Sequence, residues 1–293
     1  RDEFDKLESL QKQIEGLVQV EQQELTESER LAKLNAQQLQ SVPPQVLEQL
    51  AQHYALPAVP ERKQTIGVVM AGNIPLVGFH DLVAVFLSGH RQRIKLSSKD
   101  AVLIRHLAET LTGWAPELAE QISFSEMLKG CDAYIATGTD NSARYFEYYF
   151  GKYPHIIRKN RTSVALLEGN ETAQELEMLA DDIQLYFGMG CRNVTQILVP
   201  SGYDFLPLLN ALRKYDHYRD HDKYKNNFDY QLTIAIMNNQ FYMTNDSIVL
   251  IENESPFSPI SQIHYCYYND YQEIMNKLDP EKVQCVVSRK HIP

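Results

Sequence analysis

The sequence predicts an α/β fold built on parallel β-sheets, and three observations carry this prediction. From Thr65 onward, short runs of strand-forming residues alternate with helical segments of about ten residues or more, as in βαβ units. The run Thr65–Met70 is apolar throughout, as expected of a strand buried on both faces. Polar residues and glycines gather where three strands lead into helices, at 71–75, 97–100 and 137–142. Parallel sheets bind their ligands at such connections.

The composition is that of an ordinary soluble globular protein with room for about two domains. The chain has 293 residues, of which 44% are hydrophobic and 23% charged. Its net charge of −10, without any run of Lys or Arg, argues against nucleic-acid binding and against a polybasic membrane contact. Its four cysteines form no CxxC pair, so we expect a reducing, cytoplasmic location. The most apolar stretch, 66–87, is interrupted by Asn73, Pro75, His80 and Asp81, which argues against an integral membrane segment.

The first 60 residues are predicted to form a helical lead. Leu7, Leu10, Ile14 and Leu17 recur at helical spacing, and two further helices are expected from Thr26 and over Gln45–Tyr54. The segment is rich in Gln, Glu and Lys, so we expect it to supply packing or an oligomer surface rather than chemistry. Because the chain begins with Arg and ends just after a strand-like run, we expect that either terminus can be incomplete.

The region from Thr65 to Lys159 is predicted to contain four strands separated by three helices. The helix after the first strand ends at Ser88-Gly89, and the next begins at 97–100, where Ser and Asp side chains can cap it. The predicted strands are Thr65–Met70, Arg93–Ser97, Asp132–Ala136 and His155–Lys159. The predicted helices are Leu76–Leu87, one that is capped at 97–100 and runs to Leu111, and 143–150.

Beyond residue 160 the alternation continues through two helices, and further strand-like runs follow. The predicted helices are Glu171–Phe187 and Asp204–Lys214, and the strands Ser163–Leu167, Asn193–Val199, Gln231–Met237, Ser247–Glu252, Gln262–Tyr267 and a last run around Val286. Residues 215–230 are dense in Tyr, His and Asp. His217, Asp220, His221 and Asp222 are close in sequence, but their spacing matches no recognised metal site, so we predict a solvated polar connection without metal.

The segment from Tyr186 to Gln196 joins the end of a predicted helix to a predicted strand and carries two glycines and one cysteine, Cys191. Glycines permit a sharp turn and a close approach of another molecule. A cysteine held on such a turn is a candidate nucleophile, because the thiolate is an intrinsically strong one. The alternative is a buried cysteine beside a helix end. Cys131, Cys266 and Cys285 are expected to be structural thiols.

Taken in order, the connections resemble those of the aldehyde dehydrogenase superfamily. More narrowly, they resemble its acyl-CoA reductase branch, which includes the reductase component of the fatty-acid reductase of luminous bacteria. Gly72–Leu76 resembles the Pro-Trp-Asn-Phe-Pro loop, Ile94–Asp100 the Lys-Pro-Ser-Glu segment, and Ala136–Thr139 the Phe-Thr-Gly-Ser segment. Gly190-Cys191 stands in the place of the catalytic cysteine, and Glu254–Pro259 resembles the Glu-Ile-Phe-Gly-Pro segment. The resemblance covers roughly residues 60–293.

The resemblance implies two Rossmann-like, parallel-sheet α/β domains. Residues 61–156 would bind the nicotinamide cofactor, 157–293 would form the catalytic domain, and 1–60 would pack on the cofactor domain. It implies that Cys191 is the nucleophile and that the Asn73 amide stabilises the oxyanion. The cofactor residues would be Lys95 and Ser97 for the adenosine ribose, Thr139 for the pyrophosphate, and Glu254, with Glu252 an equal candidate, for the nicotinamide ribose. Lys99 can pair with a 2′-phosphate, which favours NADPH and leaves NADH open.

One departure from the family pattern bears on the reaction. Aldehyde-oxidising members carry a glutamate upstream of the cysteine that activates water, whereas His155–Asn160 here contains no carboxylate. The sequence therefore favours reduction of an acyl-CoA to the aldehyde through an acyl-cysteine, unless His155 or Glu168 supplies the base. The alternatives are an aldehyde or semialdehyde dehydrogenase using NAD(P)+ and a non-catalytic scaffold with the same fold. The expected partners are an acyl-CoA or acyl-thioester substrate and a second copy of the chain.

Overall fold

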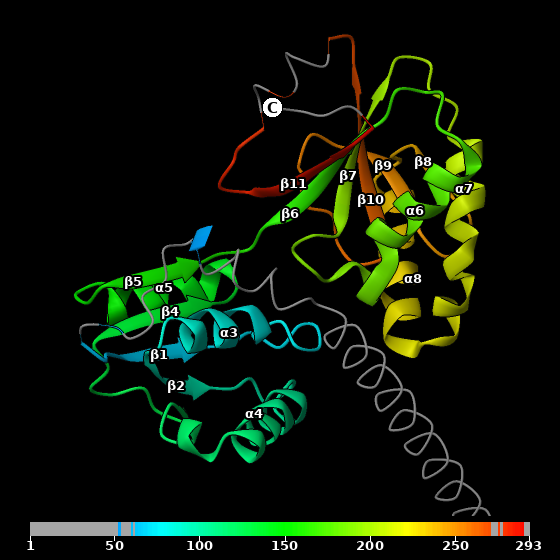
Figure 1. The fold of residues 1–293 in the computed structure, drawn as a ribbon. Helices are drawn as coiled ribbons and strands as arrows, with labels where there is room; N and C mark the ends of the chain where they lie inside the picture. The colour runs from blue at the N-terminus through cyan, green and yellow to red at the C-terminus, as the bar shows by residue number, and fades with distance from the viewer. Residues whose placement is uncertain (1–51, 54–59, 61, 271–274, 276–277, 290–293) are drawn as a thin grey trace, which may run out of the picture. The chain divides into compact units, whose positions relative to one another are not determined.

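The computed structural model describes residues 52–53, 60, 62–270, 275 and 278–289. Two β-sheets organise these residues, and both belong to one compact unit, Pro60–Pro293 (Figure 1). The predicted α/β fold class is confirmed. The helical lead predicted for residues 1–60 lies almost wholly outside the described residues.

The first sheet is parallel throughout and has the strand order β3-β2-β1-β4-β5. The strands are β1 (Thr65–Val69), β2 (Arg91–Lys95), β3 (Ile122–Phe124), β4 (Ala133–Thr137) and β5 (His155–Arg158); all but the short β3 were predicted. Helices α3 (Phe79–Leu87), α4 (Val102–Trp114) and α5 (Asp140–Phe150) connect them. The chain moves outward in one direction from β1 and in the other from β4. The carboxyl ends of β1 and β4 therefore flank a topological switch point, the usual ligand crevice of such sheets.

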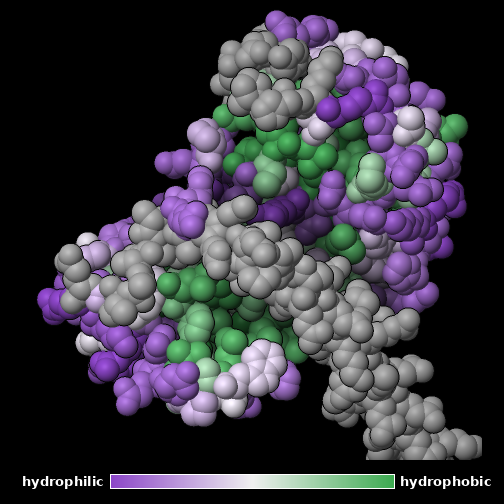
Figure 2. Space-filling model, viewed as in Figure 1, coloured by the Kyte–Doolittle hydropathy of each residue, from purple (hydrophilic) through white to green (hydrophobic). Residues whose placement is uncertain are grey.

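One face of this sheet carries an apolar groove beside α3. The groove has a volume of about 380 Å³ and is lined by side chains of β1, β4 and β5 and of α3, among them Ile66, Ile135, Ile156 and Val85. Figure 2 shows hydrophobic surface in this part of the molecule, near the position of α3 in Figure 1. Ile156 is exposed, so the groove is open to solvent along the described residues.

The second sheet has the order β11-β6-β7-β10-β9-β8 and is mixed, because the edge strand β8 pairs antiparallel with β9. Its strands are β6 (Thr162–Leu166), β7 (Val194–Pro200), β8 (Tyr242–Thr244), β9 (Val249–Glu252), β10 (Gln262–Tyr268) and β11 (Val283–Ser288). Helices α6 (Ala173–Gln184) and α7 (Leu206–Leu212) pack on it through a core that includes Leu179, Ile197 and Leu208. The predicted domain boundary at 156/157 falls inside β5, and the chain passes between the sheets at 159–161.

The strand predicted at Gln231–Met237 is wrong, and the predicted polar connection at 215–230 is largely helical. A 3-10 helix, η3 (Arg213–Asp220), leads into the helix α8 (Asp222–Met237). Leu232, Ile234 and Ile236 alternate as in a strand, but burial follows helical spacing instead: Tyr224, Phe228 and Ala235 are buried, whereas Ile234 and Ile236 are exposed. None of the described helices is long and apolar enough to cross a membrane.

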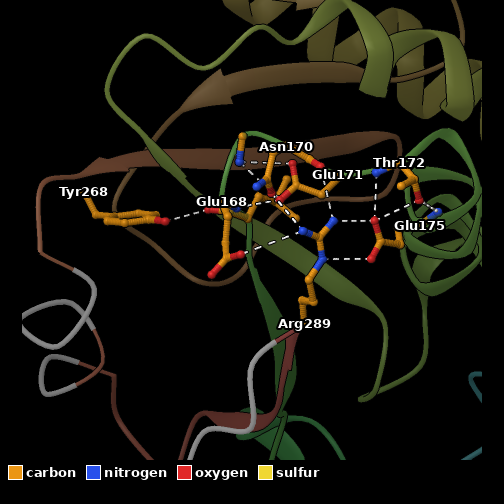
Figure 3. A network of polar contacts seen from close by, with 9 residues as sticks. Glu168, Asn170, Glu171, Thr172, Glu175, Tyr268 and Arg289 are labelled. Atoms are coloured by element: carbon orange, nitrogen blue, oxygen red, sulfur yellow. Dashed lines mark hydrogen bonds and ion pairs between the residues drawn. The ribbon is translucent and has the colours of Figure 1, made fainter.

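The start of α6 is fixed by a polar network that also holds the end of β11 (Figure 3). Thr172 and Glu175 form a capping box, each side chain bonding the other's backbone N–H. The Arg289 guanidinium, just past β11, donates to Glu175 Oε1 at 2.8 Å and to Asn170 Oδ1 at 2.9 Å. Hydrogen bonding from Arg289 is the largest effect on Glu175 and lowers the pKa of this carboxyl to about 2. One cation thus joins the last described strand to the helix that precedes the cysteine turn.

Candidate functional site

Cys191 lies on a tight turn between α6 and β7 and is exposed. Three consecutive residues of the turn have left-handed backbone angles, with φ of 55° at Tyr186, 59° at Phe187 and 71° at Gly188. Such angles are uncommon outside glycine and persist only where the surrounding contacts impose them. Because Cys191 is exposed, the alternative of a buried cysteine beside a helix end is wrong for it. Cys131, by contrast, is buried.

The side chain of Asn193 closes this turn from inside. Its Nδ2 donates to the carbonyl oxygens of Asp182, at 2.9 Å, and Leu185, at 3.0 Å, at the end of α6. Its Oδ1 accepts from Gly190 N–H at 2.8 Å. A Cβ at position 190 would lie 2.8 Å from the same oxygen, so glycine is needed there. Sequence reasoning treated Asn193 only as the first strand residue, although an Asn directly after a Gly-containing turn is a signal for such local bonding.

An aromatic cluster supports the turn through Phe187. The Phe187 ring lies 4.4 Å from Tyr218, 4.9 Å from His221 and 6.0 Å from Tyr224, between ring centroids. These partners come from η3, α8 and the residue between them, the segment predicted as a solvated connection. Among the described residues, no three His, Cys, Asp or Glu side chains are grouped as metal ligands. Tyr218, His221 and Tyr224 of this segment pack against the cysteine turn through Phe187.

Asn73 brings the connection after β1 to the cysteine turn. Its Nδ2 donates to Met189 O at 2.7 Å, two residues before Cys191. Ile74 Cδ1 is 3.5 Å from the place that a Cβ on Gly190 would occupy. Asn73 thus contacts the turn that carries Cys191, although 118 positions separate the two residues in the chain. An amide nitrogen carries two hydrogens, so one donor of Asn73 serves this bond and the other is available to a ligand.

The connection that carries Asn73 is itself held by the segment after β2. Leu76 has φ of 60°, and its N–H donates to the buried Asp100 Oδ2 at 2.8 Å. Burial raises the pKa of Asp100, while the bond from Leu76 opposes that shift. Gly72 lies against Ser97, because a Cβ at 72 would be 2.4 Å from Ser97 Oγ. The 71–75 and 97–100 connections therefore form one surface.

The predicted cofactor residues Lys95, Ser97 and Thr139 all lie at the carboxyl edge of the first sheet. Lys95 is the exposed last residue of β2, and Ser97 Oγ accepts from Lys99 N–H at 3.3 Å. Thr139 caps α5, which begins at Asp140 rather than at the predicted 143. At this edge Thr137 Oγ1 is enclosed yet has no hydrogen-bond partner among the described residues. An orphaned hydroxyl beside exposed polar connections fits the binding of a nucleotide.

Glu254 lies in the exposed connection between β9 and β10, close to the strand that follows Cys191. The Thr195 hydroxyl bonds Pro256 O, and Gln196 Nε2 donates to Asn253 O at 3.1 Å. The connection therefore runs along the first half of β7. Glu252, the exposed last residue of β9, lies at the same end, so both glutamates remain candidates for a ribose contact.

Neither of the two alternative bases lies beside Cys191. Glu168 follows the carboxyl end of β6 and pairs with Arg289 at 3.9 Å, whereas Ser163, at the amino end of β6, donates to Cys191 O at 3.3 Å. Five residues of extended chain separate Ser163 from Glu168, about 16 Å. His155 begins β5, at the amino edge of the first sheet, with its Nδ1 2.8 Å from Tyr153 O. Asn73 follows the opposite, carboxyl edge.

Comparison with solved structures identifies the architecture. An aldehyde dehydrogenase of Mycobacterium tuberculosis in complex with NAD+ matches with a TM-score of 0.56 and 14% identity, over 72% of this chain and 53% of that one. A NAD-dependent benzaldehyde dehydrogenase of Corynebacterium glutamicum matches with a TM-score of 0.58 and 13% identity, over 77% and 59%. The aldehyde dehydrogenase KauB of Pseudomonas aeruginosa gives 0.57 and 12%, over 75% and 56%.

At these identities the likeness establishes the fold. No protein-family model matches the sequence, and neither does any curated protein sequence. The chain spans little more than half the length of the solved structures just named, between 53% and 59%. The described residues have the fold of the aldehyde dehydrogenases, with Cys191 on the turn before β7 and Asn73 against it.

Proposed function

We propose that this protein reduces an acyl-CoA to the corresponding aldehyde with NADPH or NADH, through a covalent acyl-cysteine at Cys191. The observation that carries the proposal is the contact between Asn73 Nδ2 and Met189 O at 2.7 Å, which sets an amide donor against the turn of an exposed cysteine. The nucleophile, Cys191, and the oxyanion donor, Asn73, lie on connections of two different sheets and would act on one reacting carbonyl.

In the first half-reaction the Cys191 thiolate attacks the thioester carbonyl carbon. A new C–S bond forms, the oxyanion is stabilised by the Asn73 amide and by Cys191 N–H, and the CoA thiolate leaves as the carbonyl re-forms. Loss of one such donor typically costs about 3–4 kcal/mol of barrier. Asn193 and Phe187 keep the turn fixed while the sulfur changes from thiolate to thioester and back.

A reduced nicotinamide, when bound, would supply a hydride to the acyl carbon. Lys95 and Ser97 would hold the adenosine ribose, Thr139 the pyrophosphate, and Glu254 or Glu252 the nicotinamide ribose. Lys99, next to Ser97, offers a cation for a 2′-phosphate and favours NADPH. When the tetrahedral adduct on Cys191 collapses, the C–S bond breaks, the aldehyde leaves and the thiolate is restored.

The positions of Glu168 and His155, the two candidate bases, favour reduction over hydrolysis. Hydrolysis of the acyl-cysteine needs a base that activates water within hydrogen-bond reach. Glu168 stands about 16 Å of strand away from the Ser163–Cys191 contact, and His155 lies at the far edge of the other sheet. With both held elsewhere, the acyl-enzyme persists until it is reduced or returned to a thiol.

The test compares the two directions of nicotinamide chemistry on the full chain. Incubation with an acyl-CoA and NADPH should deplete the reduced nicotinamide absorbance, and the Cys191→Ala variant should not. Incubation with an aldehyde and NAD(P)+ should form carboxylic acid more slowly. Acid formation that outpaces thioester reduction would instead make the protein an aldehyde dehydrogenase. Absence of both reactions, together with no stabilisation by either cofactor, would make it a scaffold.

A further inference from the structure

Three residues of β10 project from the face of the second sheet that lies away from α6 and α7. Ile263 and Tyr265 belong to the core beneath those helices. The alternate residues of the strand, Gln262, His264 and Cys266, therefore point the other way. Gln262 and His264 are buried, with 8% and 4% of their surface exposed. Buried polar side chains are retained where they are hydrogen-bonded, so the partners of His264 decide what it does.

Both ring nitrogens of His264 are engaged. Its Nδ1 lies 2.8 Å from Ser255 O, and its Nε2 lies 2.9 Å from Nε2 of Gln262. A carbonyl oxygen only accepts, so the ring proton is on Nδ1, and Nε2 accepts from the Gln262 amide. Burial lowers the pKa of His264, and the bond to Ser255 opposes that shift. The neutral ring thus donates to Ser255, the residue after Glu254.

The backbone on the other side of Glu254 is held in a similar way. Asn253 O accepts from Gln196 Nε2 at 3.1 Å and from Cys266 Sγ at 3.0 Å. Gln196 is the register partner of His264 in the β7–β10 ladder, so the two side chains share one face of the sheet. The carbonyl groups before and after Glu254 are therefore both fixed by side chains of β7 and β10, whereas the Glu254 side chain itself is exposed.

The two glutamates that are candidates for the ribose contact differ in this support. Glu252 is the register partner of Tyr265, so these two side chains leave the face that carries α6 and α7. Glu254 lies beyond the strand, between the two fixed carbonyl groups. The Thr195 hydroxyl bonds the same connection through Pro256 O. A side chain that must meet a ligand in one position needs a supporting shell of this kind, so the geometry favours Glu254.

We infer that His264 is a positioning residue for the nicotinamide cofactor, because it holds the connection so that Glu254, rather than Glu252, meets the ribose. The inference deepens the proposed function and rests on it for the identity of the ligand. His264 touches neither cofactor nor substrate and acts through Ser255 O. Its place in a strand-like apolar run gives no local sign of this role, since its partner lies nine positions earlier in the chain.

The test measures the dissociation constants of NADPH and NADH by calorimetry on the full chain without substrate. His264→Phe keeps a ring in the space and removes both bonds, so the constant should rise roughly three- to tenfold, the size of one lost hydrogen bond. His264→Asn returns a donor near the position of Nδ1 and should recover most of the affinity. Gln262→Met keeps the ring and removes its second partner, so it should weaken binding by about twofold.

Tyr268→Phe is the matched control. The Tyr268 hydroxyl donates to Leu167 O at 2.6 Å from the carboxyl end of the same strand (Figure 3). Its loss should lower the unfolding midpoint in urea and leave the affinity for NADPH unchanged. A loss of affinity equal to that of His264→Phe would show that both variants act through general stability, and would overturn the inference.

A double-variant cycle tests the route through Glu254. In a Glu254→Gln background, His264→Phe should have no further effect on the affinity for NADPH, whereas in a Glu252→Gln background it should keep its full effect. Full effects in both backgrounds would overturn the inference, as would equal affinity in wild type and His264→Phe.

The acyl adduct on Cys191 separates this inference from the proposed function. Its formation from acyl-CoA needs no nicotinamide, so His264→Phe should form it at the wild-type rate. Binding of NADPH that depends on His264, in a wild-type chain that forms no adduct, would keep the positioning role and remove the reductase. An adduct in wild type, with equal NADPH affinity in His264→Phe, would keep the reductase and remove the positioning role. A wild-type chain that binds neither nicotinamide would overturn both.

Discussion

Asn193 shows how one amide group can hold the turn that carries Cys191. It takes no part in the chemistry, but its hydrogen bonds join the end of α6 to Gly190, the residue before Cys191. Asn245 makes a comparable set of bonds in another connection, where its Oδ1 accepts from Ser247 and Ile248 N–H, both at 3.1 Å. The two residues are matched in type and in burial, and only one supports the cysteine.

The Asn193→Ala variant should lose stability and reactivity together. Burying unpaired carbonyls and a lone N–H should cost about 1–3 kcal/mol of unfolding free energy. Acylation of Cys191 by acyl-CoA should slow, because the turn no longer presents the sulfur in one position. Asn245→Ala is the control, with a comparable loss in urea unfolding and an unchanged acylation rate. Equal acylation rates in the two variants would remove the positioning role.

Asn73→Ala should act on the rate of the reaction rather than on folding. Asn73 is exposed, so its removal should leave the unfolding midpoint nearly unchanged. If its amide stabilises the oxyanion, kcat should fall by about 10²- to 10³-fold. Steady-state kinetics with acyl-CoA and NADPH measure this directly. A variant that keeps wild-type kcat and only raises KM would show that Asn73 does no more than shape the cleft.

The sequence predicted Cys191 and Asn73 as partners but neither the turn-closing role of Asn193 nor the ion pair of Arg158. A cysteine flanked by glycines and an Asn in a strand-to-helix connection are visible as local patterns. The pair between Arg158 and Asp81 forms only once β5 lies in the sheet with β4 and β1, because 77 positions separate the two residues in the chain. Long-range pairs of this kind leave no local signature.

At the scale of elements, α8 shows the limit of periodicity. Its apolar residues Leu232, Ile234 and Ile236 alternate as in a strand. The residues that the helix buries are instead Tyr224, Phe228 and Ala235, which recur at helical spacing. Packing against the second sheet and against Phe187 decides the outcome. The same holds for β8, a three-residue antiparallel edge strand too short to give a pattern.

The capping box of α6 predicts a pH dependence. Arg289 and Thr172 depress the folded-state pKa of Glu175 to about 2 from an ordinary value of 4.5. A depressed carboxyl contributes stability above its unfolded pKa and loses it as pH falls through the folded one. The difference in unfolding free energy between wild type and Glu175→Gln, measured in urea, should therefore be largest at pH 6 and decrease between about pH 4.5 and 2. Glu177→Gln, exposed on the same helix, should show no such gap. A constant gap at all pH values would contradict the assignment.

At the scale of the whole molecule, the alternation of strands and helices was enough to predict sheets of mainly parallel strands and the edge at which connections gather. It was not enough to say which side chains share that edge. Strand order places Glu168 and Cys191 at opposite ends of neighbouring parallel strands, and His155 and Asn73 at opposite edges of the first sheet. This topology is what favours the proposed reduction over hydrolysis.

The most direct measurement is the intact mass of the full chain after mixing with an acyl-CoA in the absence of nicotinamide. We predict a stable mass gain of one acyl group, which is absent from Cys191→Ala and retained in Cys266→Ala, a variant of a half-buried cysteine in β10. Addition of NADPH should then remove the adduct and release aldehyde. No adduct, or an adduct that survives in Cys191→Ala, would contradict the account.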